Sequence, residues 1–228
     1  MKHLYCHPLF DERKCAHRFS FKLSKAFENN DLCLERFDYQ GTGEADGAFC
    51  DITFDSLKDD LGAKIDSNTT CIVGTRLGAM VAFDYCSQIE SNIQTLILIQ
   101  PFLNGQNYVE YLFRKQHLKD IMTGNQSEKS DHKDFYNLEG YKTNSILIRQ
   151  MKKLDLFERL TRNLPRKIFI IQISSSDKVN SEYKHFATHL RENGIHSAVE
   201  IFDLPVFWER IPDKDYSLLT CKIVEWCR

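Results

Sequence analysis

A short turn centred on Arg76 is the segment of this sequence that best matches a catalytic motif. Residues 74–78 read Gly-Thr-Arg-Leu-Gly, with apolar residues at 70–73 before them and at 79–83 after them. Glycines two positions before and after a central residue let a strand and a helix touch around a sharp, strained corner. The pattern G-x-S-x-G uses such a corner to present a nucleophile. Here the central side chain is a guanidinium, which stays protonated and only donates hydrogen bonds.

Alternating hydrophobic periods predict the elements that hold this turn in place. Strands are expected at 4–7, 32–39, 70–73, 95–99, 167–173 and 197–202, and helices lie between them or follow them. Right-handed crossovers then give a doubly wound, mostly parallel sheet of about six strands with helices on both faces. Ligands of such sheets bind beyond the carboxyl ends of the strands. The fold class is therefore α/β, with the turn at a ligand-binding edge.

Residues 105–165 interrupt this alternation. Amphipathic helical stretches are expected around 108–121 and 145–160, and the segment between them, 124–134, is polar. We expect 1–104 and 166–228 to form the core and 105–165 to form a small helical cap with a mobile loop.

The composition excludes several classes of protein. The chain has 228 residues, 42% of them apolar and 27% charged, and its formal charge is −2. A chain of this size buries on the order of 70% of its unfolded surface, so it is expected to fold as one globular domain without disulfides. A disordered, collagen-like or multi-domain protein is excluded, and without a basic run a nucleic-acid partner is not expected.

Location and redox state follow from two further patterns. The sequence begins Met-Lys-His-Leu-Tyr-Cys-His-Pro, without an apolar leader, and it contains no run of 18 apolar residues. A cytoplasmic protein without a membrane span is expected. The eight cysteines include no Cys-x-x-Cys pair, and several fall in apolar runs, so we expect them to be reduced.

Several short motifs follow one another in a recognisable order. They are residues 8–12 with Cys15, His17 and Arg18 after them, 37–44, 74–79, 100–105 and 205–208. In this order they resemble the α/β-hydrolase superfamily, and specifically bacterial hydrolase-like proteins found with exosortase and exopolysaccharide systems. The resemblance spans most of the chain and implies a minimal α/β-hydrolase fold with a small cap.

The resemblance also implies where a catalytic triad would lie. Asp177, in the loop after residue 173, matches the usual acid position of the superfamily. The histidine base is expected around 204–209, where this sequence has none, and His196 belongs at the opposite rim of the sheet. Losing nucleophile and base together typically removes roughly 10⁶-fold of rate. The sequence therefore lacks two of the three triad residues, the nucleophile and the histidine base.

Arg76 has two interpretations. It lies before the first turn of a helix, where the backbone N–H groups and the helix dipole favour an anion, so it can clamp a carboxylate or phosphate under the cap. Alternatively, it forms a structural ion pair with Asp177 or Asp38. The second interpretation makes Asp177 a partner of Arg76 rather than a catalytic acid.

Further candidates surround the same edge of the sheet. In the superfamily the loop after the first strand supplies an oxyanion N–H, so His7 can face the site; alternatively, it is only held extended by Pro8. We expect ligand contacts from Leu9, Phe10, Thr75, Leu77, Pro101, Tyr108, Phe207 and Trp208. The alternatives are cap packing for Tyr108 and plain core for Phe207 and Trp208.

No cofactor or metal is expected. His185 and His189, with Glu182, share one face of a helix at ligand-like spacing, but an exposed helix face is the preferred interpretation.

The favoured hypothesis is a hydrolase-fold protein with a degenerate triad that binds a small acidic or acylated ligand, or a protein partner, in a bacterial biosynthetic pathway. The alternative is an active hydrolase, lyase or acyl-transfer enzyme without serine chemistry. Arg76 would then stabilise negative charge, and His7 or Asp177 would carry protons.

Overall fold

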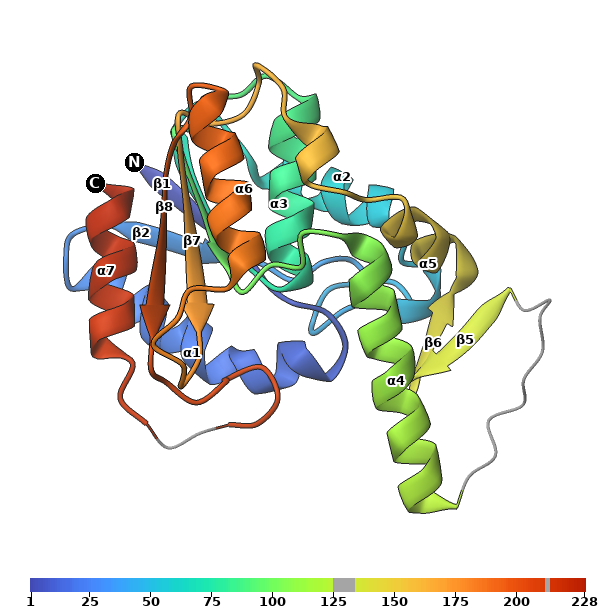
Figure 1. Cartoon of the computed structure of the whole chain (residues 1–228). Helices are drawn as coiled ribbons and strands as arrows, with labels where there is room; N and C mark the ends of the chain where they lie inside the picture. Colours follow the sequence, from blue (N-terminus) through green and yellow to red (C-terminus); the bar gives the residue numbers. More distant parts are fainter. Residues whose placement is uncertain (125–133, 212–213) are drawn as a thin grey trace. The chain divides into compact units, whose positions relative to one another are not determined.

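The computed structural model of the chain describes residues 1–124, 134–211 and 214–228. A parallel sheet of six strands lies at its centre, in the order β2-β1-β3-β4-β7-β8 (Figure 1). The strands are β1 Lys2–Cys6, β2 Cys33–Arg36, β3 Thr69–Thr75, β4 Thr95–Ile99, β7 Lys167–Ile173 and β8 His196–Phe202. Each neighbouring pair runs in parallel. The predicted α/β fold with a doubly wound sheet is confirmed.

Helices connect successive strands of the sheet, as the crossover rule requires. They are α1 Phe10–Glu28, α2 Phe54–Lys64, α3 Leu77–Gln88 and α6 Ser181–Glu192, and α7 Ser217–Cys227 follows the last strand. Between β4 and β7 lie α4 Gly105–Thr123, a hairpin of β5 Phe135–Leu138 and β6 Tyr141–Asn144, α5 Ser145–Lys152, and the short helical turn Phe157–Arg159, while a similar turn, Phe49–Asp51, precedes α2. None of the helices in the described ranges is long and apolar enough to cross a membrane.

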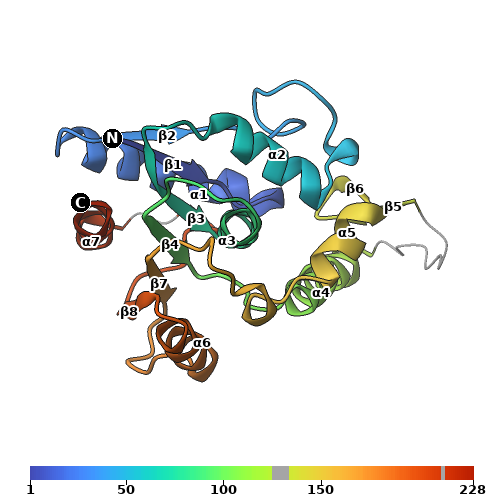
Figure 2. The same cartoon turned by 90° about the horizontal axis from the view of Figure 1, so that it is seen from above.

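Alternate residues of the strands face opposite sides of the sheet and build two apolar layers. Val73, Ile97 and Ile171 belong to one buried cluster with side chains of α1 and α7. On the other face α3 and α6 meet through the rings of Phe83 and Phe186, whose centroids are 5.6 Å apart. Figure 2 shows α7 on one side of the sheet and α3 and α6 on the other. The sheet is therefore covered on both faces, as its apolar strands require.

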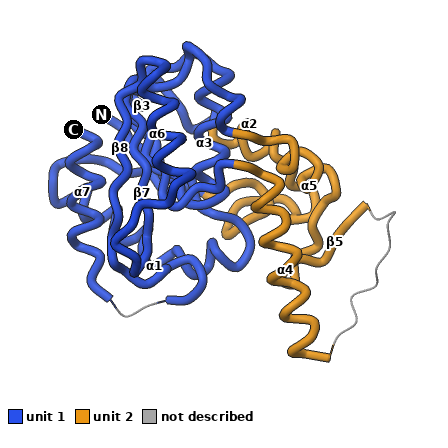
Figure 3. Tube along the Cα trace, viewed as in Figure 1, with its two compact units in different colours: residues 1–37, 62–103, 156–228 blue, residues 38–61, 104–155 orange. Residues whose placement is uncertain are grey.

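The chain divides into two compact units (Figure 3). Unit 1 comprises residues 1–37, 62–103 and 156–228 and holds the sheet; unit 2 comprises 38–61 and 104–155. Unit 2 thus takes in 38–61, a segment that the sequence analysis assigned to the core, and it ends at 155. The assignment of 105–165 as an inserted cap stays a prediction.

Hydrogen bonds explain why 38–61 belongs with the later helices. The Gln150 side chain in α5 donates to the Asp55 carboxylate at 2.5 Å and accepts from the Phe54 backbone N–H at 2.7 Å. These bonds satisfy a donor at the first turn of α2, which has no partner within its own helix. The two parts of unit 2 are joined in this way.

The region between β4 and β7 differs from expectation in two respects. The β5–β6 hairpin was not predicted, and the helix expected over 145–160 ends at Lys152. Asp155 instead pairs with Asn104, whose side-chain nitrogen donates to its carboxylate at 3.0 Å, and this bridge draws the chain out of helical geometry. The predicted mobile loop at 124–134 falls largely on residues 125–133, outside the described residues.

Candidate functional site at the turn around Arg76

The turn around Arg76 has the strained geometry that its glycines predict. β3 ends at Thr75 and α3 begins at Leu77, and Arg76 between them has φ 55° and ψ −119°. A positive φ is rare for a residue with a side chain and costs free energy that the surrounding structure must supply. A Cβ atom at Gly78 would collide with the backbone of Cys6 and His7. The small residue is therefore required for α3 to pass close to the end of β1.

This turn lies at the switch point of the sheet. From β1 the chain crosses to β2 at one side, and from β3 it crosses to β4 at the other side. The loops that leave β1 and β3 therefore diverge, which is where open α/β sheets form ligand sites. The loop after β1 leads within three residues into α1, whose first turn contains Glu12.

Arg76 forms a buried ion pair with Glu12. Arg76 Nε donates to Glu12 Oε1 at 3.1 Å, and Nη2 donates to the same oxygen at 3.0 Å. Glu12 is fully buried, and Arg76 is 6% exposed. Glu12 is the third residue of α1, where the helix dipole favours a carboxylate. The positive charge at the turn is therefore balanced by the protein itself.

Two aromatic rings flank the same guanidinium. The Arg76 Cζ atom lies 4.4 Å from the centroid of Phe102 and 5.2 Å from that of Trp208. Phe102 follows β4 and Trp208 follows β8, so loops that leave two different strands converge on one side chain. Cation–π contacts of this kind stabilise a cation that has lost its water.

A tyrosine of α6 completes the surroundings of this group. The Tyr183 hydroxyl donates to the carbonyl oxygen of Pro101 at 2.7 Å. Burial raises the pKa of Tyr183, and the nearby charge of Arg76 acts in the opposite direction. Both Tyr183 and Pro101 are buried.

The ion pair described above joins Arg76 to Glu12, a carboxylate that the sequence analysis did not name. Asp177 is an exposed residue of the loop after β7. Asp38 lies in unit 2, where its carboxylate accepts from the backbone N–H of Glu44 at 3.1 Å. The observed ion pair is with Glu12, four positions before Ala16 on the buried face of α1. A charged residue on an apolar helical stripe is the signal that could have identified it.

His7, Tyr5 and Thr75 form a second buried group beside the turn. The hydroxyls of Tyr5 and Thr75 are 2.8 Å apart, and the rings of Tyr5 and His7 meet edge to face at 4.8 Å. Burial raises the pKa of Tyr5, which keeps its phenol neutral. The Thr75 hydroxyl therefore pairs with a phenol rather than with a histidine base.

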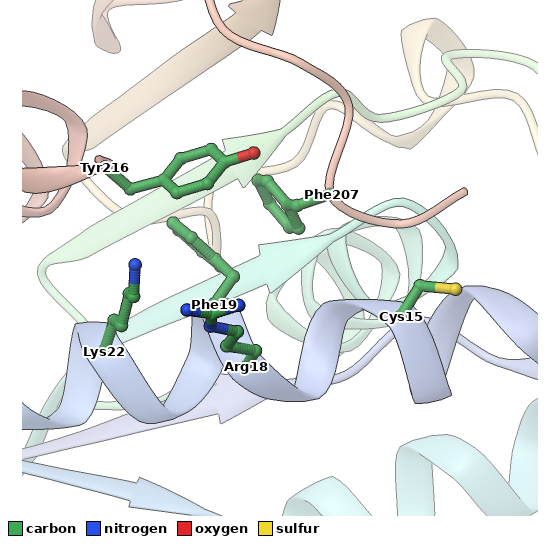
Figure 4. A pocket seen from close by; sticks show the side chains of 6 residues that line it. All are labelled: Cys15, Arg18, Phe19, Lys22, Phe207 and Tyr216. Carbon is green, nitrogen blue, oxygen red and sulfur yellow. The ribbon is translucent and has the colours of Figure 1, made fainter. Parts of the chain in front are cut away.

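Phe207 and Trp208 are adjacent but have different surroundings. Trp208 contacts Arg76, whereas Phe207 stacks on Phe19 of α1 with ring centroids 3.9 Å apart. Figure 4 shows Phe207 beside Phe19 and Tyr216 around a small cavity. The cavity has room for about one water molecule. Phe207 is thus a core residue of the α1 and α7 layer.

The other sequence candidates are buried at several places. Leu9 precedes α1, Phe10 opens it with φ 58°, and Leu77 opens α3; all three are at most 2% exposed. Tyr108 is a buried residue of α4 in unit 2 and stacks near Tyr111 with ring centroids 6.3 Å apart.

No cluster of three His, Cys, Asp or Glu side chains that could hold a metal ion occurs among the residues that the structure describes. The rings of His185 and His189 contact the ring of Phe157, with centroid distances of 5.1 and 5.7 Å. Their spacing on α6 therefore brings them to one aromatic residue.

Comparison with solved structures identifies the fold. A hydrolase from Agrobacterium vitis superposes with a TM-score of 0.64 at 15% identity, covering 100% of this chain and 88% of that one. Est1E from Butyrivibrio proteoclasticus, with ferulic acid bound, gives a TM-score of 0.64 at 14% identity, covering 98% and 86%. The mouse α/β-hydrolase domain-containing protein 10 gives 0.60 at 15% identity, covering 98% and 88%. The chain therefore has the α/β-hydrolase fold.

Sequence comparisons give no closer relative. No protein-family model matches the chain, and no curated protein is significantly similar to it. Identities near 15% show a shared fold and leave the activity to be argued from the site itself.

Proposed function

We propose that this chain uses the α/β-hydrolase fold for binding rather than for hydrolysis. The observation that carries the proposal is the buried pair of Arg76 and Glu12 at the position where a hydrolase of this fold presents its nucleophile. A guanidinium with a balanced charge neither attacks a carbonyl carbon nor takes a proton from a water molecule.

The neighbouring groups support the same proposal. Thr75, the hydroxyl next to the turn, is fully buried and bonded to Tyr5. The loop after β8 carries Trp208 against Arg76 and contains no histidine between residues 203 and 211. Nucleophilic catalysis needs a base within hydrogen-bond reach of the nucleophile. These residues supply neither an activated nucleophile nor a histidine base.

The ion pair also favours one class of ligand over another. An acidic ligand would have to compete with Glu12 for Arg76, and Glu12 is already desolvated and oriented. A neutral acyl group faces no such competitor and suits apolar walls such as Leu77 and Phe102. Of the two ligand classes that the sequence suggests, we therefore favour the acylated one. The motif resemblance would place this role in bacterial polysaccharide biosynthesis.

Matched esters and acids test the proposal. Methyl butyrate and methyl hexanoate should raise the melting temperature by about 4 °C at roughly ten times their dissociation constants. The corresponding carboxylates should leave it unchanged. Proton NMR of the same samples should show no release of acid from the esters.

Three other outcomes would contradict the proposal. If the carboxylates stabilise the wild type but not the double variant Glu12→Gln/Arg76→Met, Arg76 acts as an anion clamp. If the esters are consumed, the chain is an active enzyme of this fold with non-serine chemistry. If neither series changes the melting temperature, short acyl groups are not ligands. The double variant is chosen because it removes both charges together and leaves none unpaired.

A further inference from the structure

Two cysteines meet at the end of the sheet opposite the Arg76 turn. Cys71 lies near the start of β3, and Cys227 lies in the last turn of α7. Their sulfur atoms are 3.0 Å apart although 156 positions separate the residues in the sequence. Cys71 is 1% exposed and Cys227 is 6% exposed. The two thiols therefore face each other inside unit 1.

From this contact we infer that Cys71 and Cys227 form a thiol–disulfide modification site whose co-reactant is a low-molecular-weight disulfide such as oxidised glutathione. A disulfide requires a sulfur–sulfur distance of about 2.05 Å, so each sulfur atom has to move by about 0.5 Å. Rotation about the Cα–Cβ bonds of the two cysteines can supply a displacement of this size. The inference does not depend on the proposed binding function.

Cys227 is the residue that reacts first. It is the more exposed of the two, and it lies in a terminal helical turn, where backbone hydrogen bonds open most readily. Its thiolate attacks the small disulfide, which forms a mixed disulfide and releases one glutathione thiolate. Cys71 stays shielded during this step.

The second step closes the bond inside the protein. The Cys71 thiolate attacks the Cys227 sulfur and expels the second glutathione thiolate. The two released thiolates take up the two protons that the cysteines lost, and two electrons pass from the protein sulfurs to the small disulfide. Burial and the neighbouring Cys227 raise the pKa of Cys71, which lowers the fraction of thiolate available for this attack.

The bond would connect the strand that carries the functional turn to a helix of the opposite layer. β3 runs from Cys71 directly to Thr75, and α7 packs against α1. Because the bond closes a loop of more than 150 residues, it restricts the unfolded chain strongly. Oxidation is therefore expected to stabilise unit 1 without altering the residues around Arg76.

The test is oxidation of the folded, full-length chain with oxidised glutathione, followed by acid quenching and alkylation of the remaining thiols in denaturant. Cys71 and Cys227 should both escape alkylation, and digestion without reductant should yield a crosslinked peptide pair that contains the two residues. The melting temperature should rise by about 10 °C. Dithiothreitol should reverse the change.

Two variants separate this site from general oxidation. Cys221→Ser removes an exposed cysteine of the same helix and should leave both the crosslink and the thermal shift in place. Cys227→Ser should abolish both. The inference is overturned if Cys71 and Cys227 remain alkylatable in the oxidised wild type, or if either is found crosslinked to another cysteine. Because these readouts use the wild type, poor folding of a variant does not affect them.

Discussion

Arg76 keeps its charge in a buried position because three neighbouring side chains replace the water that it has lost. Glu12 accepts two of its hydrogen bonds, and the faces of Phe102 and Trp208 lie against its guanidinium. A planar, weakly hydrated guanidinium suits such an environment better than an ammonium group does. The same surroundings would be wrong for a serine nucleophile, which needs a base rather than a carboxylate on its flank.

The first prediction concerns Glu12. Glu12→Gln keeps the shape of the side chain but removes the carboxylate charge that pairs with the buried Arg76. We expect it to lower the free energy of unfolding by about 3 kcal/mol, because breaking one partner of a buried pair strands the other charge. Urea unfolding followed by circular dichroism measures the change.

Glu28→Gln is the matched control, because Glu28 pairs with Lys25 on the exposed side of the same helix. It should cost at most about 0.5 kcal/mol. Equal losses for the two variants would show that the pair at Arg76 contributes no more than a surface ion pair.

The second prediction concerns the pH dependence of stability. Burial lowers the pKa of His3, although the hydrogen bond between its Nδ1 and the Cys33 carbonyl oxygen acts in the opposite direction. Above the unfolded pKa both states hold a neutral imidazole, and His3 has no effect. As the pH falls through about 6.5, the unfolded chain binds a proton that the folded chain resists, so the free energy of unfolding decreases.

His3→Asn tests this assignment, because its amide can still donate to the Cys33 carbonyl. Between about pH 7.5 and about pH 5.5 the variant should lose less stability than the wild type. His17→Asn, at an exposed position of α1, should follow the wild type. An unchanged pH dependence in His3→Asn would show that the imidazole titrates alike in both states.

At the scale of elements, the turn between β3 and α3 depends on its glycines for close packing. Gly78 lies where α3 passes the carboxyl end of β1, and Gly74 lies against Ala79. The third prediction is that Gly78→Ala lowers the free energy of unfolding by about 3 kcal/mol, because the added methyl group must displace backbone rather than a flexible side chain.

Gly194→Ala provides the comparison for backbone strain alone. Gly194 has φ +78° and open space around its Cα atom, so its substitution should cost only about 1 kcal/mol. Both variants can be measured by urea unfolding. If Gly78→Ala is the milder of the two, α3 does not depend on close approach to β1.

Local patterns predicted the elements of the core and the turn, but not the contacts made at the turn. Spacing of apolar residues predicted β4 at residues 95–99, and paired glycines predicted the strained residue at 76. Phe102 and Trp208 meet Arg76 from loops more than 100 positions apart, and only the strand order brings such loops together. Long-range contacts of this kind have no local signature.

The hairpin and Glu12 illustrate two different reasons for a missed feature. β5 and β6 are four residues each, too short for alternation to stand out. Glu12 did carry a signal, since it shares the buried stripe with Ala16 and Phe19. Its partner, however, follows only from the sheet order, which places the end of β3 beside the end of β1.

For the whole molecule, fold and activity have to be separated. Solved hydrolases with 11–16% identity share the fold over most of their length, yet the fold alone supports both hydrolysis and binding. The binding proposal rests on Arg76, which pairs with Glu12 at the turn between β3 and α3. The central claim is that no activated hydroxyl or thiol occupies that position.

A fluorescent fluorophosphonate probe, which reacts covalently with activated serine residues, tests this claim most directly. We expect no labelling of the native chain above the level of a heat-denatured sample, under conditions that fully label an active serine esterase of the same fold. Labelling of the native chain that disappears when one serine or threonine is substituted would contradict it.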